Sequence, residues 1–181
     1  MANKGFANRA RHAFLRVSLV LTALAAGCVY PTSSTNITPA GVGTVAHNPH
    51  AVSIEVSGGS SASAWSIQDT VLRNAAAQAV SRLQVFKHIT GPDTADVLMR
   101  AQILGHDFKE GPYTTTAIVT VRWALLRPDG SVIWDDTLES RGATNMSETP
   151  TPVKRPIVAS ERAAGANIRM ALERIPELSP P

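Results

Sequence analysis

The spacing of apolar residues changes along the chain, and the order of these changes limits the folds that it can adopt. Residues 51–57 alternate apolar and polar side chains, which is the period-2 pattern of a half-buried strand. Residues 67–83 then carry one apolar stripe at helical spacing, with Ser66 and Asp69 placed as a capping box. Period 2 returns in three further segments, 95–106, 113–126 and 132–141. A second amphipathic helix follows at 156–175.

This order of strand, helix, three strands and helix predicts an α+β fold. Each helix has a single apolar stripe, so two such helices cover only one face of a four-stranded sheet. We therefore expect a two-layer sandwich, in which a four-stranded, largely antiparallel sheet has both helices on one face. The side of the last helix opposite its apolar stripe carries Glu161, Arg162, Asn167, Arg169 and Arg174.

The last two strands are joined by a tight Pro-Asp-Gly turn at 128–130. Their apolar residues share one face only if the connecting loop has an even number of residues. That register places Leu125 opposite Trp134 and Val121 opposite Leu138. A three-residue loop would instead turn Trp134 to the other face.

The first 27 residues have the parts of a secretory signal. A basic region without acidic residues is followed by Val17–Ala26, a run of ten apolar and small residues. At 1.5 Å per residue this run is too short for a permanent transmembrane helix, which crosses about 30 Å of hydrocarbon. Cys28, the only cysteine in the sequence, comes directly after Leu24-Ala25-Ala26-Gly27.

This segment resembles the lipobox of bacterial lipoproteins. The resemblance implies cleavage before Cys28, a diacylglycerol on its sulfur, and a fatty acyl chain such as palmitate on the new amino terminus. Several acyl chains anchor a protein stably where one chain is marginal. Because Val29 rather than Asp follows the cysteine, the resemblance also implies sorting to the outer membrane, on its periplasmic side. The alternative is a plain signal peptidase that cuts after the small residues.

Charge gives no sign of a nucleic-acid partner. The net charge of the whole chain is +3, but four of the 17 basic residues precede Cys28, which leaves 13 basic against 14 acidic residues in the mature chain. No block of Lys or Arg marks a nucleic-acid surface. We expect residues 1–27 to be a signal peptide and 28–50 a flexible, lipidated tether. Residues 51–176 should form one periplasmic domain, and residues 177–181 should fray.

One loop is a candidate for hydrolase chemistry. The Gly58–Ala62 loop lies between a strand and a helix, where a nucleophile elbow would lie, and His88 and His106 are available as bases. Ala62 stands where the G-x-S-x-G pattern requires glycine. We therefore expect a plain loop, with a hydrolase using Ser60 or Ser61 as the alternative.

No metal or cofactor site is predicted. The segment 47–50 holds two histidines, but a metal site needs three or four ligands on a rigid frame, so we expect solvated loop residues. Asp135 and Asp136 are neighbours on a strand and should point to opposite faces. We expect Trp65 to be partly exposed, since it stands just before the first helix.

The lipobox, a short tether and the order β-α-β-β-β-α resemble small Gram-negative envelope lipoproteins. The nearest in layout are the LptE-type lipopolysaccharide-assembly lipoproteins and the YajG-type lipoproteins. Auxiliary lipoproteins of lipid-transporting ABC systems and LpoB-type activators of peptidoglycan synthases are looser matches. The resemblance rests on element order over about residues 51–175, and Cys28 is its only specific site residue. It implies a non-enzymatic adapter in envelope biogenesis or lipid transport, with a serine hydrolase or a peptidoglycan-synthase activator as alternatives.

The sheet face that the helices leave uncovered is the candidate binding surface. The pattern fits an ordinary solvated face, with a weak ion pair between Arg122 and Glu139. It also fits a mixed apolar and basic surface for a protein partner or an anionic lipid headgroup. Alternation also places His106 on this face. The partner-binding residues of the second hypothesis are Arg100, Arg122, Leu104, Ile118 and Ile133.

Overall fold

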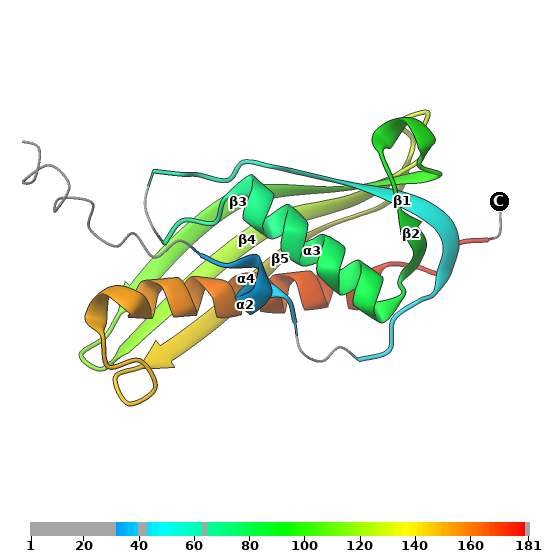
Figure 1. The fold of residues 1–181 in the computed structure, drawn as a ribbon. Coiled ribbons are helices and arrows are strands. Elements are labelled where there is room, and N and C mark those ends of the chain that lie inside the picture. Colours follow the sequence, from blue (N-terminus) through cyan, green and yellow to red (C-terminus); the bar gives the residue numbers. More distant parts are fainter. Residues whose placement is uncertain (1–31, 40–42, 63–64, 180–181) are drawn as a thin grey trace, which may run out of the picture.

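The computed structural model describes residues 32–39, 43–62 and 65–179 of the 181-residue chain, so Cys28 and the expected signal peptide lie outside the described residues. The fold is mixed α+β, with one five-stranded sheet in the order β2-β1-β3-β4-β5 (Figure 1). The strands are β1 (Asn48–Ser57), β2 (Phe86–Ile89), β3 (Val97–Glu110), β4 (Thr114–Leu126) and β5 (Val132–Asn145). The α-helices are α2 (Ser34–Ile37), α3 (Asp69–Leu83) and α4 (Arg155–Arg174), and the 3-10 turns are η1 (Pro92–Thr94) and η2 (Pro152–Lys154).

The α+β class is confirmed, but the expected count of four strands is wrong because β2 was missed. Gln84 ends α3 in the left-handed region, with φ of 52°, and turns the chain back toward the sheet. The four residues of β2 then pair in parallel with β1, and only Phe86 among them is buried. A strand this short, with one buried residue, has no alternation to detect.

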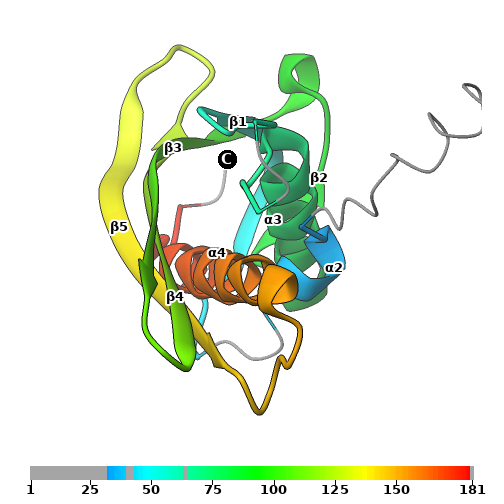
Figure 2. The same ribbon diagram turned by 90° about the vertical axis from the view of Figure 1, so that its left-hand side faces the viewer.

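The sheet curves around α3 and α4, which lie on its concave side (Figure 2). α3 packs against β1, and α4 crosses β4 and β5. Small residues allow this close approach, since a Cβ at Gly142 on β5 would meet the Ala159 carbonyl oxygen of α4 at 2.3 Å. The largest side chains that are fully buried between the layers include Trp123, Leu72, Met99, Leu125, Ile168 and Leu172.

The predicted register of the last hairpin is confirmed. Leu125 pairs with Trp134 and Val121 pairs with Leu138. The pairing is irregular at the end of this hairpin. Leu125 pairs with Trp134 and Leu126 pairs with Val132, so Ile133 between them has no partner on β4. This extra residue explains why Val132, expected on the helix-covered face, is 58% exposed.

The predicted capping box at the start of α3 is wrong. The helix begins at Asp69 with Gln68 as its N-cap, which makes no side-chain capping bond. Asp69 Oδ1 instead accepts a hydrogen bond from the Gly59 backbone N–H at 2.6 Å, so the carboxylate holds the loop between β1 and α3. Trp65 is 41% exposed in this connection, as expected.

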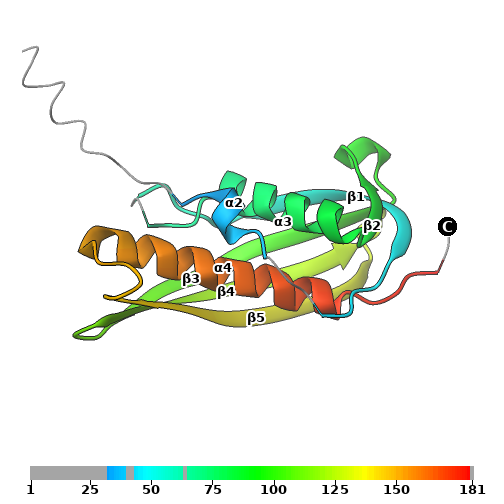
Figure 3. The same cartoon turned by 60° about the horizontal axis from the view of Figure 1, so that its bottom comes forward.

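The described part of the expected tether packs on the domain. The short helix α2 lies across α3 and α4 on the side away from the sheet (Figure 3), and Ile37 is fully buried. Glu161 of α4, expected on the solvent side of its helix, is buried and accepts hydrogen bonds from the Ser33 N–H at 2.8 Å and Asn36 Nδ2 at 3.0 Å. The polar composition of 32–39 suggested a flexible coil, but these polar groups instead satisfy buried partners on the helices.

The start of β1 and the C-terminal residues also depart from expectation. Asn48 and His50, assigned to the tether, belong to β1 and are buried. Asn48 Oδ1 accepts a hydrogen bond from the Leu178 N–H at 2.7 Å, and His50 Nε2 lies 2.7 Å from the Ser179 carbonyl oxygen. Residues 177–179 are therefore held against β1, not frayed. No helix in the described part of the chain has both the length and the apolar character that crossing a membrane requires.

Candidate functional site

The register of the sheet arranges the side chains of its uncovered face in rows that cross the strands. Directly paired residues point to the same face of a sheet. Three successive rows are Ser53, Leu98, Leu126 and Val132; Glu55, Arg100, Ala124 and Asp135; and Ser57, Gln102, Arg122 and Thr137. Ala124, a small residue, stands in the middle of the charged row and leaves a depression between its neighbours.

A hollow of about 560 Å³ lies over this depression, and we call it the sheet hollow. The η1 turn and the turn between β4 and β5 form its rim, through Pro92 and Pro128. Its charged lining residues are Arg100, Arg122, Arg127 and Asp135, and its apolar lining includes Leu98, Ala124 and Val132. Three guanidinium groups face two carboxylates, Asp135 in the lining and Glu55 beside Arg100, so the hollow has an excess of one positive charge.

Arg100 and Arg122 of the sheet hollow form ion pairs, and their side chains are exposed. Arg100 Nη2 lies 3.3 Å from Glu55 Oε2, and Arg122 Nε donates to Asp135 Oδ1 at 3.0 Å. Hydrogen bonding and charge from Arg122 lower the pKa of Asp135, and the same contact raises the pKa of Arg122. Because the arginine side chains are about half exposed, these ion pairs contribute little to stability. A guanidinium has five N–H donors, so each arginine retains donors for an incoming carboxylate or phosphate.

The expected ion pair between Arg122 and Glu139 is wrong. Arg122 faces Thr137, so Asp135 and Glu139 both lie diagonal to it on β5. Glu139 forms an ion pair with Arg141 on its own strand, with 3.0 Å between Oε1 and Nη2, and Arg122 forms one with Asp135.

The structure brings two of the five predicted binding residues together in one hollow, Arg100 and Arg122. Ile118 shares their face but lies further along β4, opposite Asp107 and Arg141. The other two lie at irregularities of the sheet. Leu104 stands at a bulge of β3 and is 52% exposed, and Ile133 lines a separate hollow near the C-terminal residues.

Arg127 and the apolar rim were missed because they belong to the turn between β4 and β5. The sequence predicts that turn from Pro-Asp-Gly, but nothing in the local pattern indicates that it rises over the sheet. The turn is held by the Ser131 N–H, which donates to Asp129 Oδ1 at 2.9 Å, and by Arg127, whose Nη1 donates to Ser131 Oγ at 3.3 Å. These contacts hold Arg127 at the edge of the hollow.

The expectation that His106 lies on the uncovered face is wrong. The bulge between Ile103 and Gly105 changes the alternation, so His106 turns to the side of α4, where its Nε2 lies 3.0 Å from Ser160 Oγ. Burial lowers the pKa of this imidazole and outweighs the opposing effect of Asp107. The ring is therefore neutral at physiological pH.

The hydrolase alternative has one supporting observation and several against it. Ser60 and His106 line the same small hollow of about 270 Å³. However, Ser60 Oγ accepts the Ala62 N–H at 3.0 Å, and the nearest partner of His106 Nε2 is the buried Ser160. His88 is paired with Ala51, seven residues before Gly58 on β1, which is roughly 23 Å along a strand. Within the described residues, no hydrogen bond joins Ser60 to a histidine.

No metal site is found among the described residues, since no group of three His, Asp or Glu side chains comes together there. His47 Nδ1 lies 2.8 Å from the Gln84 carbonyl oxygen, and His50 is buried in β1. The prediction that Asp135 and Asp136 face opposite ways is confirmed. Asp135 pairs with Arg122 on the uncovered face, whereas Asp136 pairs with Arg174 of α4 at 2.6 Å.

Comparison with known proteins identifies the fold. No protein-family model and no curated protein matches the sequence. A DUF330 protein from Xanthomonas campestris superposes with a TM-score of 0.57 at 11% identity, over 75% of this chain and 87% of that one. The two proteins share a fold. At this identity the similarity extends to the fold alone.

Two further solved structures are more distant. The PelC dodecamer from Paraburkholderia phytofirmans gives a TM-score of 0.47 at 14% identity, over 73% of this chain and 89% of that chain. A minor lipoprotein from Acinetobacter baumannii gives 0.42 at 12% identity, over 72% and 96%. These are similarities of layout only.

Proposed function

We propose that this protein is a lipoprotein of the outer membrane, held on the periplasmic side by acylated Cys28. In this proposal it acts as a non-enzymatic adapter in envelope biogenesis or lipid transport. The sheet hollow is its binding site, and the ligand is an anionic group, a carboxylate or a phosphate, carried by an envelope protein or a lipid. The resemblance of its element order to LptE-type and YajG-type lipoproteins supports this class of role.

The observation that carries the proposal is the composition of the sheet hollow. Its volume of about 560 Å³ is in the range of small-molecule sites, roughly 300–1,000 Å³. Arg100 of β3, Arg122 of β4 and Arg127 of the β4–β5 turn line it, together with the apolar Leu98 and Ala124. Forked donors beside apolar surface suit a ligand that has an anionic head and an apolar body.

The position of the hollow supports an adapter function. Its rim is formed by η1 and the turn between β4 and β5, at the end of the sheet opposite the β3–β4 hairpin (Figure 1). A domain that is anchored at one end has its other end free to meet a partner in the periplasm. This arrangement requires no catalytic residue.

Affinity purification of the lipidated protein from outer membranes tests the proposal. The expected result is a specific envelope protein or an anionic lipid that is retained by the wild type and absent from a mock purification. A peptidoglycan synthase among the retained proteins would assign the activator role. Recovery of the protein with no enriched protein or lipid would contradict an adapter function.

The second candidate function, a serine hydrolase, rests on the shared hollow of Ser60 and His106. A fluorophosphonate probe reacts with activated serines, so labelling distinguishes the two candidates. We expect no labelling of the purified protein. Labelling that disappears in Ser60→Ala or Ser61→Ala would establish the hydrolase.

A further inference from the structure

We propose that one end of the domain rests on the membrane surface, so that the protein does not float on a flexible tether. We call this the entry end, and it comprises the described residues of the β1–α3 connection (58–62 and 65–68), the β3–β4 hairpin and the segment 145–155 before α4. It is the end to which the chain comes from Cys28. This inference rests on the proposed acylation of that cysteine, and its occupant is the lipid bilayer that holds the acyl chains.

The chain between the acylated cysteine and the domain is short. Thr32 is 4% exposed, and its Oγ1 donates to the Ser66 carbonyl oxygen at 3.2 Å. Four residue steps separate Cys28 from Thr32, and a fully extended chain covers at most about 14 Å in four steps. The domain surface around Ser66 must therefore stay close to the membrane.

The docked segment is fastened well enough to transmit this restraint. The Ser33 N–H and Asn36 Nδ2 donate to the two carboxylate oxygens of Glu161, which is 6% exposed. Arg82 of α3 donates to the Pro39 carbonyl oxygen, and Ile37 is fully buried. Releasing α2 would break these hydrogen bonds and expose Ile37 to water, so undocking costs free energy.

The exposed apolar side chains are concentrated at one end of the domain. Among the described residues, seven large apolar side chains are exposed, and five of them belong to the entry end or lie beside it. These five are Trp65 at 41%, Leu104 at 52%, Tyr113 at 69%, Met146 at 52% and Val153 at 62%. Figure 2 looks onto this end and shows the β3–β4 hairpin and the segment before α4 close to the start of that helix.

These side chains have the chemistry of a membrane interface. Trp and Tyr have an apolar ring and a polar atom, and they are enriched where lipid meets water. Leu104 lines the small hollow beside Ser66, next to the place where the N-terminal segment docks. Exposed apolar residues scattered over a surface are ordinary, but five of seven at one end of the domain are a concentration that suits an interaction surface.

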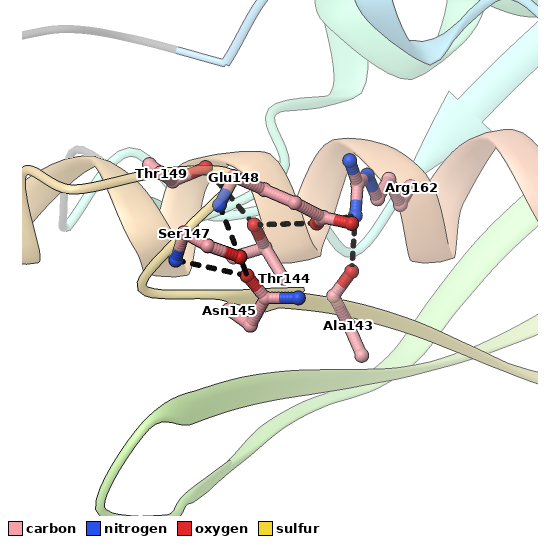
Figure 4. Close-up of polar contacts among 7 residues, drawn as sticks. All are labelled: Ala143, Thr144, Asn145, Ser147, Glu148, Thr149 and Arg162. Carbon is pink, nitrogen blue, oxygen red and sulfur yellow. Dashed lines mark hydrogen bonds and ion pairs between the residues drawn. The ribbon is translucent and has the colours of Figure 1, made fainter.

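Hydrogen bonds within the loop that carries Met146 hold it in a defined conformation (Figure 4). Asn145 Oδ1 accepts from the N–H groups of Ser147 at 3.0 Å and Glu148 at 2.9 Å. The Met146 N–H donates to the Tyr113 carbonyl oxygen at 2.9 Å, which joins the loop to the β3–β4 hairpin.

Glu148, the acidic residue of this loop, forms an ion pair with Arg162 of α4. Glu148 accepts from Arg162 at 2.7 Å, and the pKa of this carboxyl is lowered by that contact. The acidic group of the loop is thus neutralised by a fixed partner. It adds no isolated negative charge beside an anionic lipid surface.

Depth-dependent fluorescence quenching tests the inference on the mature, acylated protein. Since Cys28 is the only cysteine and is acylated, an introduced cysteine is the only free thiol. Tyr113→Cys and Val153→Cys place a bimane label at the entry end. Ile89→Cys is the matched control, because Ile89 is 36% exposed, pairs with Val52 away from the entry end and does not line the sheet hollow. The protein is reconstituted into vesicles of phosphatidylethanolamine and phosphatidylglycerol, with and without doxyl-labelled lipid.

We expect doxyl lipid to remove most of the emission at positions 113 and 153 and to leave position 89 nearly unchanged. Equal emission at all three positions, in protein that still floats with the vesicles, would overturn the inference and leave the lipid anchor intact. Shielding of 113 and 153 without quenching by lipid would show that a second copy or another protein covers this end, and would also overturn it. Protein that fails to float would contradict the anchor itself and, with it, both proposals.

Discussion

The indole N–H of Trp123 on β4 donates a 2.8 Å hydrogen bond to Asn167 Oδ1 on α4, and both side chains are fully buried. The Asn167 amide group in turn donates to the Leu138 carbonyl oxygen at 2.8 Å and to Ser140 Oγ at 3.0 Å. Ser140 Oγ also donates to the Ala163 carbonyl oxygen at 2.8 Å. This buried polar cluster fixes where α4 lies on β4 and β5.

Replacing Asn167 should therefore destabilise the whole domain. Asn167→Leu keeps a side chain of similar size but leaves the Trp123 N–H without its acceptor, and one unsatisfied buried group costs about 1–3 kcal/mol. The free energy of unfolding, measured with urea, should fall by that amount or more. Arg169→Leu, at an exposed position of the same helix, should change it little. Equal stability of Asn167→Leu and the parent would show that the cluster is dispensable.

Local patterns could predict the main elements, but not the contacts that join them. The period of residues 113–126 predicted β4, and apolar matching predicted the pairing of Leu125 with Trp134, because both depend on neighbours in sequence. Asn167 was placed on the solvent side of its helix because a helical stripe counts apolar residues only. Its partners come from residues 119, 123, 138 and 140, which lie 27 or more positions away.

The candidate site shows the same division. Arg100 and Arg122 were predicted together because strand alternation puts both on one face. Leu104 and Ile133 were misplaced because each stands at an irregularity of the pairing, where alternation fails. Arg127 depends on how a turn folds over the sheet, and α2 depends on a buried carboxylate more than 120 residues away along the chain.

A glycine substitution tests the docking of the N-terminal segment. A Cβ at Gly165 of α4 would meet the Ile37 carbonyl oxygen at 2.5 Å, so Gly165→Ala should push α2 away from the helices. Hydrogen exchange at the Ile37 and Thr38 amides should accelerate. Gly91→Ala is the control, because no atom lies within 4 Å of its added Cβ and its φ of −72° suits alanine. Unchanged protection of both amides in Gly165→Ala would contradict the packing described for α2.

Stability should depend on pH through His106. Burial lowers the pKa of this imidazole from 6.5, so the folded state favours the neutral ring more than the unfolded state does. The resulting stabilisation is fully present above about pH 6.5 and is lost as the pH falls through the lower pKa of the folded state. Urea midpoints measured downward from pH 8 should fall in the parent and fall less steeply in His106→Gln. Parallel profiles for the two proteins would exclude His106 as the cause.

The anchor is tested by Cys28→Ser. Without the thiol no diacylglycerol can be attached, and no helix of the described residues can cross a membrane. The variant should be recovered as a soluble or uncleaved form, in contrast to the parent in the outer-membrane fraction. A variant that fractionates with outer membranes as the parent does would refute the lipobox assignment.

The most direct test of the central claim is charge reversal in the sheet hollow. Arg100→Glu with Arg122→Glu should leave the fold intact, since both side chains are exposed and their ion pairs are weak. The matched control, Arg73→Glu with Arg141→Glu, changes the net charge equally at exposed positions that do not line the hollow. After purification from outer membranes, the first double variant should lose the protein or lipid that the parent retains, and the control should keep it. Retention of the same partners by the folded first variant would show that the sheet hollow is not the binding site.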